Sequence, residues 1–306
     1  MFRNMTFSFT KHFKIFAIIS ILLVVTGIVG LLCLPFGVRL FNFDIDFLGG
    51  TTMQFELHTK VDRAVTDDVA DIVHNVAGIR PSSVISGGDE GTQVIIKSAE
   101  LDSATRDAVF AAVAEKYGIP EGEQPIKSDY VSASVGSDLR NAAITASVVA
   151  VLLILVYITF RFELRSGIAA IVALVHDILV MLSMYIIFRI PFNMNFIAAA
   201  LTILGYSINA TIVVFDRIRE NRKLDSKSDF GDVVDRSIWQ TMTRSINTTV
   251  TTLFPIVLLL IFGVSSVRNF ALPLTIGILS GCYSSVCISG PVWNLLHNRK
   301  SKKKAA

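Results

Sequence analysis

Six long apolar runs divide the chain, and each is long enough to cross a lipid bilayer as a helix. About 20 consecutive apolar residues span the hydrocarbon core at a helical rise of about 1.5 Å per residue. A soluble core of this size needs no runs of such length, so the pattern predicts a polytopic α-helical membrane protein with six transmembrane helices. The runs cover residues 15–34, 142–160, 167–188, 196–215, 246–264 and 270–296.

One hydrophilic block separates the first run from the second and has the pattern of a small α+β domain. Strand-like alternation covers residues 51–57, 83–86, 93–97 and 130–135, and helical periodicity covers 62–77 and 101–117. The order βαββαβ indicates a ferredoxin-like domain, a fold that by itself names no function.

The positions of the charges predict an orientation. The chain has 306 residues, a mean hydropathy of +0.59 and a formal net charge of +3. Lys and Arg gather before the first run, between runs two and three, between runs four and five, and after run six. The opposite short loops carry only Arg189 and Arg268. The positive-inside rule therefore places both termini in the cytoplasm and the α+β domain outside it.

The expected organisation follows from these patterns. It comprises a cytoplasmic N-terminus (1–14), a first transmembrane helix (15–35), an extracytoplasmic domain (36–138), a five-helix transmembrane bundle (139–298) and a basic cytoplasmic tail (299–306). The first run is too long for a cleaved signal peptide and lacks a small-residue cleavage site, so we interpret it as an uncleaved anchor. The tail could be a nucleic-acid or lipid patch, but we interpret it as a topology anchor that contacts membrane lipid.

Enzymatic chemistry has no visible basis in this chain. The hydrophilic block holds no cluster of metal ligands, no G-x-S-x-G motif and no phosphate-binding loop. Its histidines, His58 and His74, are isolated, which is typical of solvated surface residues. The three cysteines all lie inside apolar runs, so we expect no disulfide framework. We therefore expect no enzyme, no cofactor, no metal and no nucleic-acid partner.

Polar side chains interrupt the fourth run and its continuation to residue 221. Lipid does not solvate an amide or a phenol, so these groups must face protein or a wet cavity. Steps of four and three residues place them on one helix stripe, which consists of Thr202, Tyr206, Asn209, Val213 and Asp216. The stripe indicates either a helix–helix seam or a conduction path.

Asp177 lies about ten residues into the third run, roughly 15 Å deep and near the middle of the bilayer. A charge there costs at least several kcal/mol unless it is paired or protonated. Burial favours the protonated form of a carboxyl group, which suits a proton carrier. The alternative is a structural carboxyl group bonded to a partner such as His176, and both interpretations stay open.

Two further sets of residues have the spacing of packing faces. Small residues recur every four positions on the sixth run, which allows close approach of another span or of a partner protein. That stripe consists of Gly277, Gly281, Ser285 and Ser289. On the fifth run, Thr248, Thr251 and Thr252 could form hydrogen bonds across helices or line a wet path.

Five segments, in order along nearly the whole chain, resemble SecF and so the SecD/SecF family of protein-export subunits. They are DIDFLGGT (44–51), VGSDLRNAA (135–143), RFELRSGIAAIVALVHD (161–177), GYSIN with the TIVVFDRIREN that follows (205–221), and RSINTTVTTL (244–253). The resemblance implies a half of the RND-superfamily architecture that pairs with SecD. It also implies that the pair assists the SecY channel and draws a translocating polypeptide outward with the proton motive force or a sodium gradient.

One position departs from the pattern of that family. The resemblance implies an aspartate after Asn209, opposite Arg244, but this chain has Ala210. Three explanations are open: part of the relay is lost, the charges come from the SecD partner, or Asn209 and the threonines hold a water or ion path. The ion-coupling candidates are therefore Asp177, Arg244 and Asn209. Tyr206, Thr248, Thr252, Gly277 and Gly281 are candidates for the polar path or for helix packing.

Two other functions compete with an ion-coupled export subunit. The first is a purely structural subunit that stabilises SecD and carries no ions, which the alanine at position 210 favours. The second is half of an RND-type small-molecule exporter. Such exporters usually carry both halves and two outer domains, whereas this chain has one of each.

Overall fold

The structure, a computed structural model, describes residues 7–36, 40–88, 90–120, 122–263 and 265–305. The chain divides into two compact units. The first, a helical membrane unit, contains Met1–Asn42 and Thr145–Ala306, and the second, an α+β unit, contains Phe43–Ile144.

Six helices among the described residues are long and apolar enough to cross a membrane, which confirms the six predicted spans. They are α1 (Phe13–Cys33), α5 (Ala133–Arg161), α6 (Leu164–Ile187), α7 (Met194–Leu224), α8 (Phe230–Phe262), and α9 (Ser265–Ser284), which continues through a π-helical turn (Ser285–Ser289) into α10 (Gly290–Ala305). The short elements of this part of the chain are a 3₁₀ turn (Leu34–Phe36), β1 (Asn42–Phe43) and β6 (Pro191–Phe192).

The centre of the membrane unit is formed by α6, α7 and α9, and most of its buried residues lie on these helices. The helix α1 packs against α6 at a glycine: a Cβ on Gly27 would come within 2.6 Å of the Leu179 carbonyl oxygen. The Gly27 amide also donates to the Ser183 hydroxyl at 2.8 Å. In contrast, α5 and α8 expose long apolar faces, such as Leu153 and Phe254, which suit lipid or a partner.

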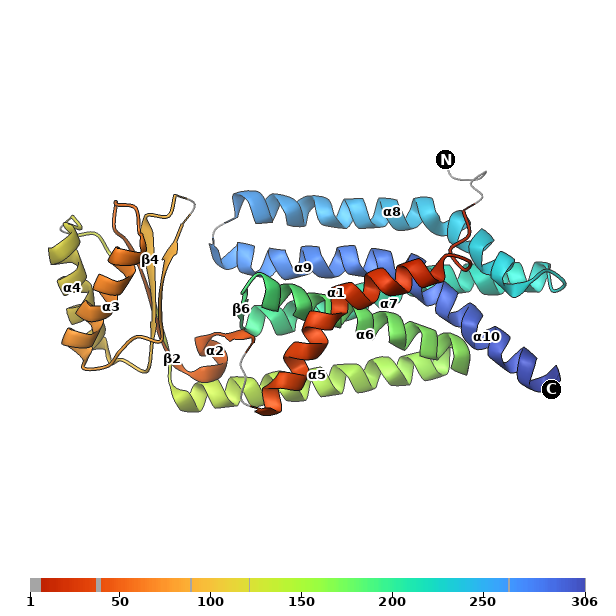
Figure 1. The fold of residues 1–306 in the computed structure, drawn as a ribbon, viewed down its shortest axis with the longest axis horizontal. Helices are drawn as coiled ribbons and strands as arrows, with labels where there is room; N and C mark the ends of the chain where they lie inside the picture. The colour runs from red at the N-terminus through yellow and green to blue at the C-terminus, as the bar shows by residue number, and fades with distance from the viewer. Residues whose placement is uncertain (1–6, 37–39, 89, 121, 264, 306) are drawn as a thin grey trace. The chain divides into compact units, whose positions relative to one another are not determined.

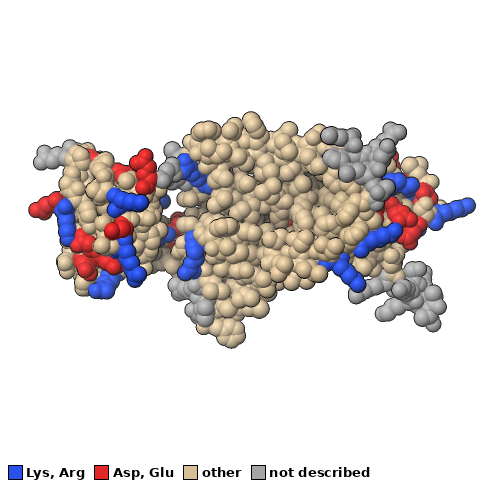
Figure 2. Space-filling view, turned by 45° about the horizontal axis from the view of Figure 1, so that its top comes forward, with Lys and Arg blue, Asp and Glu red and all other residues tan. Residues whose placement is uncertain are grey.

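Charged side chains avoid the middle of the membrane unit. Figure 2 shows that the visible surface of this unit carries its Lys, Arg, Asp and Glu side chains at its ends, with a wide uncharged band between them. A band of this kind is expected where a surface meets hydrocarbon, because a charged side chain at the bilayer centre is costly.

Residues 216–245, between the fourth and fifth apolar runs, do not form one long loop. Instead, α7 continues to Leu224 and α8 already begins at Phe230, after the N-cap Asp229 (Figure 1). These extensions carry charges, which lower their hydropathy, yet each keeps an apolar face. Ile218 on α7 and Ile238 on α8 are fully buried, so packing and not lipid supports the added turns.

The α+β unit confirms the ferredoxin-like prediction. Its elements are β2 (Gly50–Glu56), α3 (Arg63–Ala77), β3 (Ser83–Gly87), β4 (Gln93–Ser98), α4 (Ser103–Tyr117) and β5 (Lys127–Val131), preceded by the short α2 (Ile45–Leu48). The sheet order is β3-β4-β2-β5 with antiparallel pairs. Both long helices begin at aspartate caps, Asp62 and Asp102, and both end at left-handed glycines, Gly78 and Gly118. The core lies between the sheet and these helices, around Met53, Phe55 and Ile96 among others.

Two details of this unit differ from the sequence-based expectation or refine it. The last strand ends at Val131, four residues earlier than predicted, because Ser132 accepts a hydrogen bond from the Val135 amide and α5 begins. Gly49 and Gly50 have positive φ angles and bend the chain where β2 begins. Only glycine fits at position 50, because a Cβ there would lie 2.5 Å from the Ser98 carbonyl oxygen of β4.

Candidate functional site

Asp177 is fully buried near the middle of α6, as its depth in the sequence predicted. Four side-chain donors converge on its carboxylate. Ser280 donates to Oδ1 at 2.6 Å, and the His176 Nδ1 lies 3.1 Å from the same oxygen. The hydroxyls of Ser207 and Ser284 donate to Oδ2 at 2.5 and 2.7 Å. Hydrogen bonds from four donors replace much of the water that a carboxylate loses on burial.

The serines reach Asp177 because α7 and α9 approach each other closely at two glycines. A Cβ on Gly277 would lie 2.4 Å from the Ile203 side chain, and one on Gly281 would lie 3.2 Å from the Ser207 Cβ. Ser280 and Ser284 lie one turn apart on α9, so both face α6. The small-residue stripe is therefore a packing face within this chain, and it gives no independent argument for a partner.

The π-helical turn follows this serine pair directly. It contains Ser285 and Ser289, the remaining members of the small-residue stripe, and both are fully buried. Their hydroxyls bond to carbonyls of their own helix, at 3.0 Å to Cys282 and 2.7 Å to Ser285. Single π-helical turns inside α-helices occur frequently at functional sites, because they re-aim side chains.

His176 is the other buried titratable residue of this site. Its ring lies 5.7 Å from the Tyr283 ring, centroid to centroid. Its Nε2 atom is buried and has no hydrogen-bond partner among the described residues. Sequence reasoning considered His176 only as a structural partner of Asp177 and missed all three serines. Ser207 lies off the polar stripe of the fourth run, and Ser280 and Ser284 lie off the small-residue stripe of the sixth.

A second polar region lies between α7 and α8, where Ala210 and Arg244 line one cavity of about 50 Å³. Tyr206, Asn209, Val213, Ser245 and Thr248 complete its lining. Ala210, where the resemblance implies an aspartate, therefore lies opposite Arg244, as the resemblance also implied. Among the described residues Arg244 has no ion-pair partner. Asp216 lines a neighbouring pocket together with Arg244, but it is bound by Arg161 at 2.7 Å and by Arg219 at 3.4 Å.

The candidate threonines of α8, Thr248, Thr251 and Thr252, bond to carbonyls of their own helix. Thr248 donates to the Arg244 carbonyl at 2.9 Å, and Thr252 donates to the Thr248 carbonyl at 2.8 Å. At the level of the cavity, a hydrogen bond from the Tyr206 hydroxyl to Thr249, at 3.3 Å, joins α7 to α8. Further along the two helices, Asn221 donates to Ser237 and to Gln240, at 2.7 Å each. Asn209, Arg244 and Thr248 are exposed on the surface of this chain. Polar groups at such positions in a membrane need protein or water against them.

The predicted ion-coupling residues therefore fall into two separate places. Asp177 lies inside the α6–α7–α9 centre, whereas Arg244 and Asn209 lie at the α7–α8 surface. Ser207 faces the first place and Tyr206 and Asn209 face the second, so α7 carries polar groups on both of its sides. No hydrogen bond or ion pair between the described residues joins Asp177 to Arg244.

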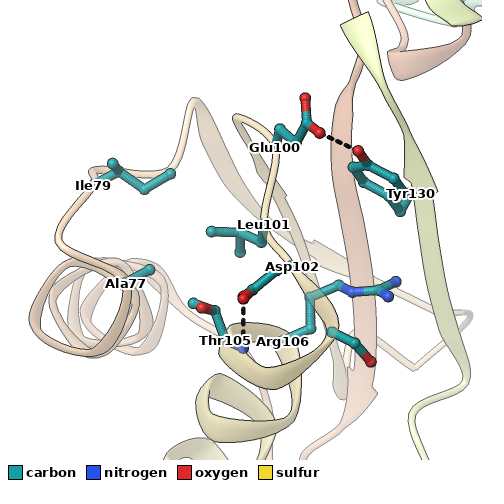
Figure 3. A pocket seen from close by; sticks show the side chains of 9 residues that line it. Ala77, Ile79, Glu100, Leu101, Asp102, Thr105, Arg106 and Tyr130 are labelled. Carbon is teal, nitrogen blue, oxygen red and sulfur yellow. Dashed lines mark hydrogen bonds between the residues drawn. The ribbon is translucent and has the colours of Figure 1, made fainter.

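The α+β unit has a pocket of about 590 Å³ at the edge of its sheet (Figure 3). Ala77, Ile79 and Leu101 form its apolar floor. At the rim, the Tyr130 hydroxyl donates to Glu100, and the Arg106 guanidinium lies 5.7 Å from the Tyr130 ring centroid. Tyr130 lies on β5, which pairs only with β2 in the described sheet. The pocket combines an apolar floor with charged groups of both signs, a composition suited to contacts with a peptide.

Two ionic contacts stabilise the same unit. Lys116 bonds to Asp68 at 2.5 Å and the Tyr117 hydroxyl donates to the same carboxylate at 2.6 Å, which lowers the pKa of Asp68. His58 is not isolated, contrary to the expectation. Its Nε2 lies 3.0 Å from Glu123, and this hydrogen bond raises the pKa of His58. Within the described residues, no group of three His, Cys, Asp or Glu side chains could hold a metal ion.

The fold and the membrane site define a class of protein: a multi-pass helical membrane protein with a carboxylate among its central helices and one ferredoxin-like domain. The family described as protein export membrane protein SecD/SecF, C-terminal, matches residues 113–299. The chain therefore belongs to the SecD/SecF family of protein-export membrane proteins, and it is a multi-pass protein of the bacterial inner membrane.

Similar proteins cover nearly all of the chain. The SecF translocase subunit of Alicyclobacillus acidocaldarius is 38% identical over 86% of this chain and 85% of that protein. The SecF subunit of Acidaminococcus fermentans is 38% identical over 97% of this chain and 99% of that protein. The SecDF subunit of Bacillus subtilis is 36% identical over 97% of this chain but only 39% of that protein.

A solved structure has the same fold. The crystal structure of SecDF from Thermus thermophilus matches with a TM-score of 0.82 and 31% identity, over 96% of this chain and 39% of that chain. The match thus covers most of the length of the separate SecF subunits and about two fifths of the length of SecDF.

Proposed function

We propose that this chain is an accessory subunit of the Sec protein translocase and that it pairs with a SecD-like partner to promote protein export. The observation that carries the proposal is the share of each relative that aligns with this chain. SecF subunits align over nearly their whole length, and SecDF aligns over about two fifths of its chain. The part of SecDF without a counterpart here supports a SecD-like half as the missing partner.

The exposed faces of the membrane unit support the same partnership. Arg244, Asn209 and Thr248 lie on one surface of α7 and α8, and a second membrane half would remove them from lipid. Expression with the SecD-like protein of the same genome tests the proposal. The two proteins should co-purify in mild detergent and together should restore secretion in cells depleted of their own SecD and SecF. Restoration by this chain alone would contradict the pairing.

We further propose that the subunit couples an ion gradient to export through Asp177. A buried carboxylate in the middle of a membrane helix is costly and is a functional candidate by default. Its hydrogen-bond partners come from three helices, so a change in the charge of this buried site can alter how α6, α7 and α9 pack. Export into membrane vesicles should slow when an ionophore collapses the gradient. Comparing a proton ionophore with a sodium ionophore identifies the coupling ion.

A structural subunit without ion coupling is the second candidate. Two observations favour it: the carboxylate of Asp177 already has four donors, and Ala210 leaves Arg244 without an acid. Under this alternative, vesicles with this chain would export at a rate that does not respond to either ionophore beyond the effect seen without the chain. A small-molecule exporter has less support, because the relatives are translocase subunits.

The orientation and the remaining partners are also proposals. The basic ends of the helices support cytoplasmic termini and an α+β unit outside the cytoplasm. In that place, the pocket around Tyr130 and Arg106 would be available to the translocating polypeptide as it leaves the SecY channel. The resemblance to export subunits supports these partners, and crosslinking from Tyr130 to a stalled secretory protein tests them.

A further inference from the structure

We propose that His176 is the proton-binding group of the membrane unit and that Asp177 stays ionised as its fixed counter-charge. This inference rests on the proposed ion coupling and specifies the atom that takes up the proton. The group that gains and loses the proton is then the imidazole of His176. Burial alone would assign the proton to the carboxylate of Asp177.

The first argument is electrostatic. Within the six apolar runs, His176 and Asp177 are the only residues among Asp, Glu, Lys, Arg and His. An ionised Asp177 alone would give this region a net negative charge in a medium that penalises charge. One proton on the adjacent imidazole makes the pair neutral overall and keeps the two opposite charges in contact, at 3.1 Å.

The second argument is the hydrogen bonding of Asp177. Each of its oxygens accepts from two groups, which uses the acceptor capacity of an ionised carboxylate. A proton on either oxygen would have to replace one of these donors or force a serine hydroxyl to reverse. Hydrogen bonds made to the charged form stabilise that form. The three serines therefore favour a carboxylate that remains ionised.

The third argument is that the Nε2 atom of His176 has no hydrogen-bond partner among the described residues. The carboxylate can only accept, so the neutral imidazole donates through Nδ1–H and leaves Nε2 unprotonated. This Nε2 is buried and has no partner among the described residues. A proton added there forms an imidazolium ion and breaks no bond, since Nδ1–H remains on Asp177. Deprotonation at Nε2 reverses the step.

The other titratable groups near the pair do not supply a competing charge. The Tyr283 ring of α9 lies against His176, but its hydroxyl donates to the Phe16 carbonyl of α1 at 2.9 Å and lies 3.3 Å from Ser20. Cys287, in the π-helical turn, is buried. No Lys or Arg contacts Asp177 or His176 in the described part of the chain. His176 is thus the base closest to the carboxylate.

Nuclear magnetic resonance of ¹⁵N-histidine in the full chain, in phospholipid vesicles, tests the inference between about pH 5 and about pH 8. The ring of His176 should change from the neutral Nδ1–H form to the doubly protonated form. Its signal should be lost in His176→Gln and kept in His74→Gln, a matched control on the exposed surface of α3. In Asp177→Asn this protonation should be lost from the same pH range, because the counter-charge is gone.

Infrared spectra of the unaltered chain provide an independent measurement. Acidification over the same range should produce no carboxylic-acid band from a buried aspartate. Such a band, assigned to Asp177 by its loss in Asp177→Asn, would overturn the inference, as would a His176 ring that stays neutral throughout.

The inference and the proposed coupling fail in different ways. If His176 takes up the proton but export does not depend on a gradient, the coupling is wrong and the protonation site stands. If Asp177→Asn removes gradient-dependent export while His176 never becomes protonated, the coupling stands and this inference is wrong.

Discussion

The variant Ala210→Asp tests whether the missing acid at position 210 is the reason that Arg244 has no ion-pair partner. The two residues line the same cavity of about 50 Å³, so a carboxylate introduced at position 210 can reach the guanidinium without displacing a packed side chain. At about 4 Å and an effective dielectric constant of about 20, the attraction is about 4 kcal/mol. Loss of hydration and of side-chain freedom offsets part of it, so we expect a net coupling of about 1–3 kcal/mol.

A double-mutant cycle isolates this coupling from the separate effects of each change. The four proteins are the unaltered chain, Ala210→Asp, Arg244→Ala and the double variant, and thermal unfolding in detergent gives their relative stabilities. Thr202→Asp is the control, because Thr202 is exposed on the same helix but does not line the cavity. Additive effects of Ala210→Asp and Arg244→Ala would refute the reasoning, because they would mean that Arg244 does not face position 210.

Three further predictions follow from packing, ionic contacts and topology. Gly281→Leu should destabilise the chain itself by about 1–3 kcal/mol or more through overpacking against α7, whereas Gly205→Leu, with open space around its Cβ, should have little effect in thermal unfolding. Tyr117→Phe should lower the local stability of the α+β unit by about 1 kcal/mol at neutral pH, measured by hydrogen exchange. Because the pKa of Asp68 is lowered in the folded state, its contribution is present above the unfolded pKa, and the effect of Tyr117→Phe should fade as acid protonates this carboxylate. A cysteine in place of Asp71 should react with an impermeant reagent in intact spheroplasts, and labelling only after membrane rupture would contradict the orientation.

Hydropathy and periodicity predicted the fold well, because lipid and a two-layer domain impose strong patterns on a sequence. All six spans and the βαββαβ order are confirmed. Hydropathy failed over residues 217–236, where charged residues share helices with buried Ile218 and Ile238. There, the helical period of a few apolar residues was the informative signal, and mean hydropathy concealed it.

The candidate site was only partly predictable. The depth of Asp177 and the role of Gly281 in helix packing follow from position and spacing. The partners of Asp177 do not, because Ser207, Ser280 and Ser284 come from two other helices and depend on how these rotate in packing. The four-residue spacing of Ser280 and Ser284 was a usable signal, but a neighbouring stripe of small residues drew the interpretation away from it.

The most direct test of the account is gradient-dependent export with Asp177→Asn. Asparagine keeps the shape and most of the hydrogen bonding of Asp177 but cannot carry its charge. In membrane vesicles, the unaltered chain should stimulate export only while the ion gradient is maintained. The variant should still co-purify with its SecD-like partner and should lose that stimulation. Equal stimulation by the two proteins across a range of external pH would contradict the account and leave Asp177 with a structural role.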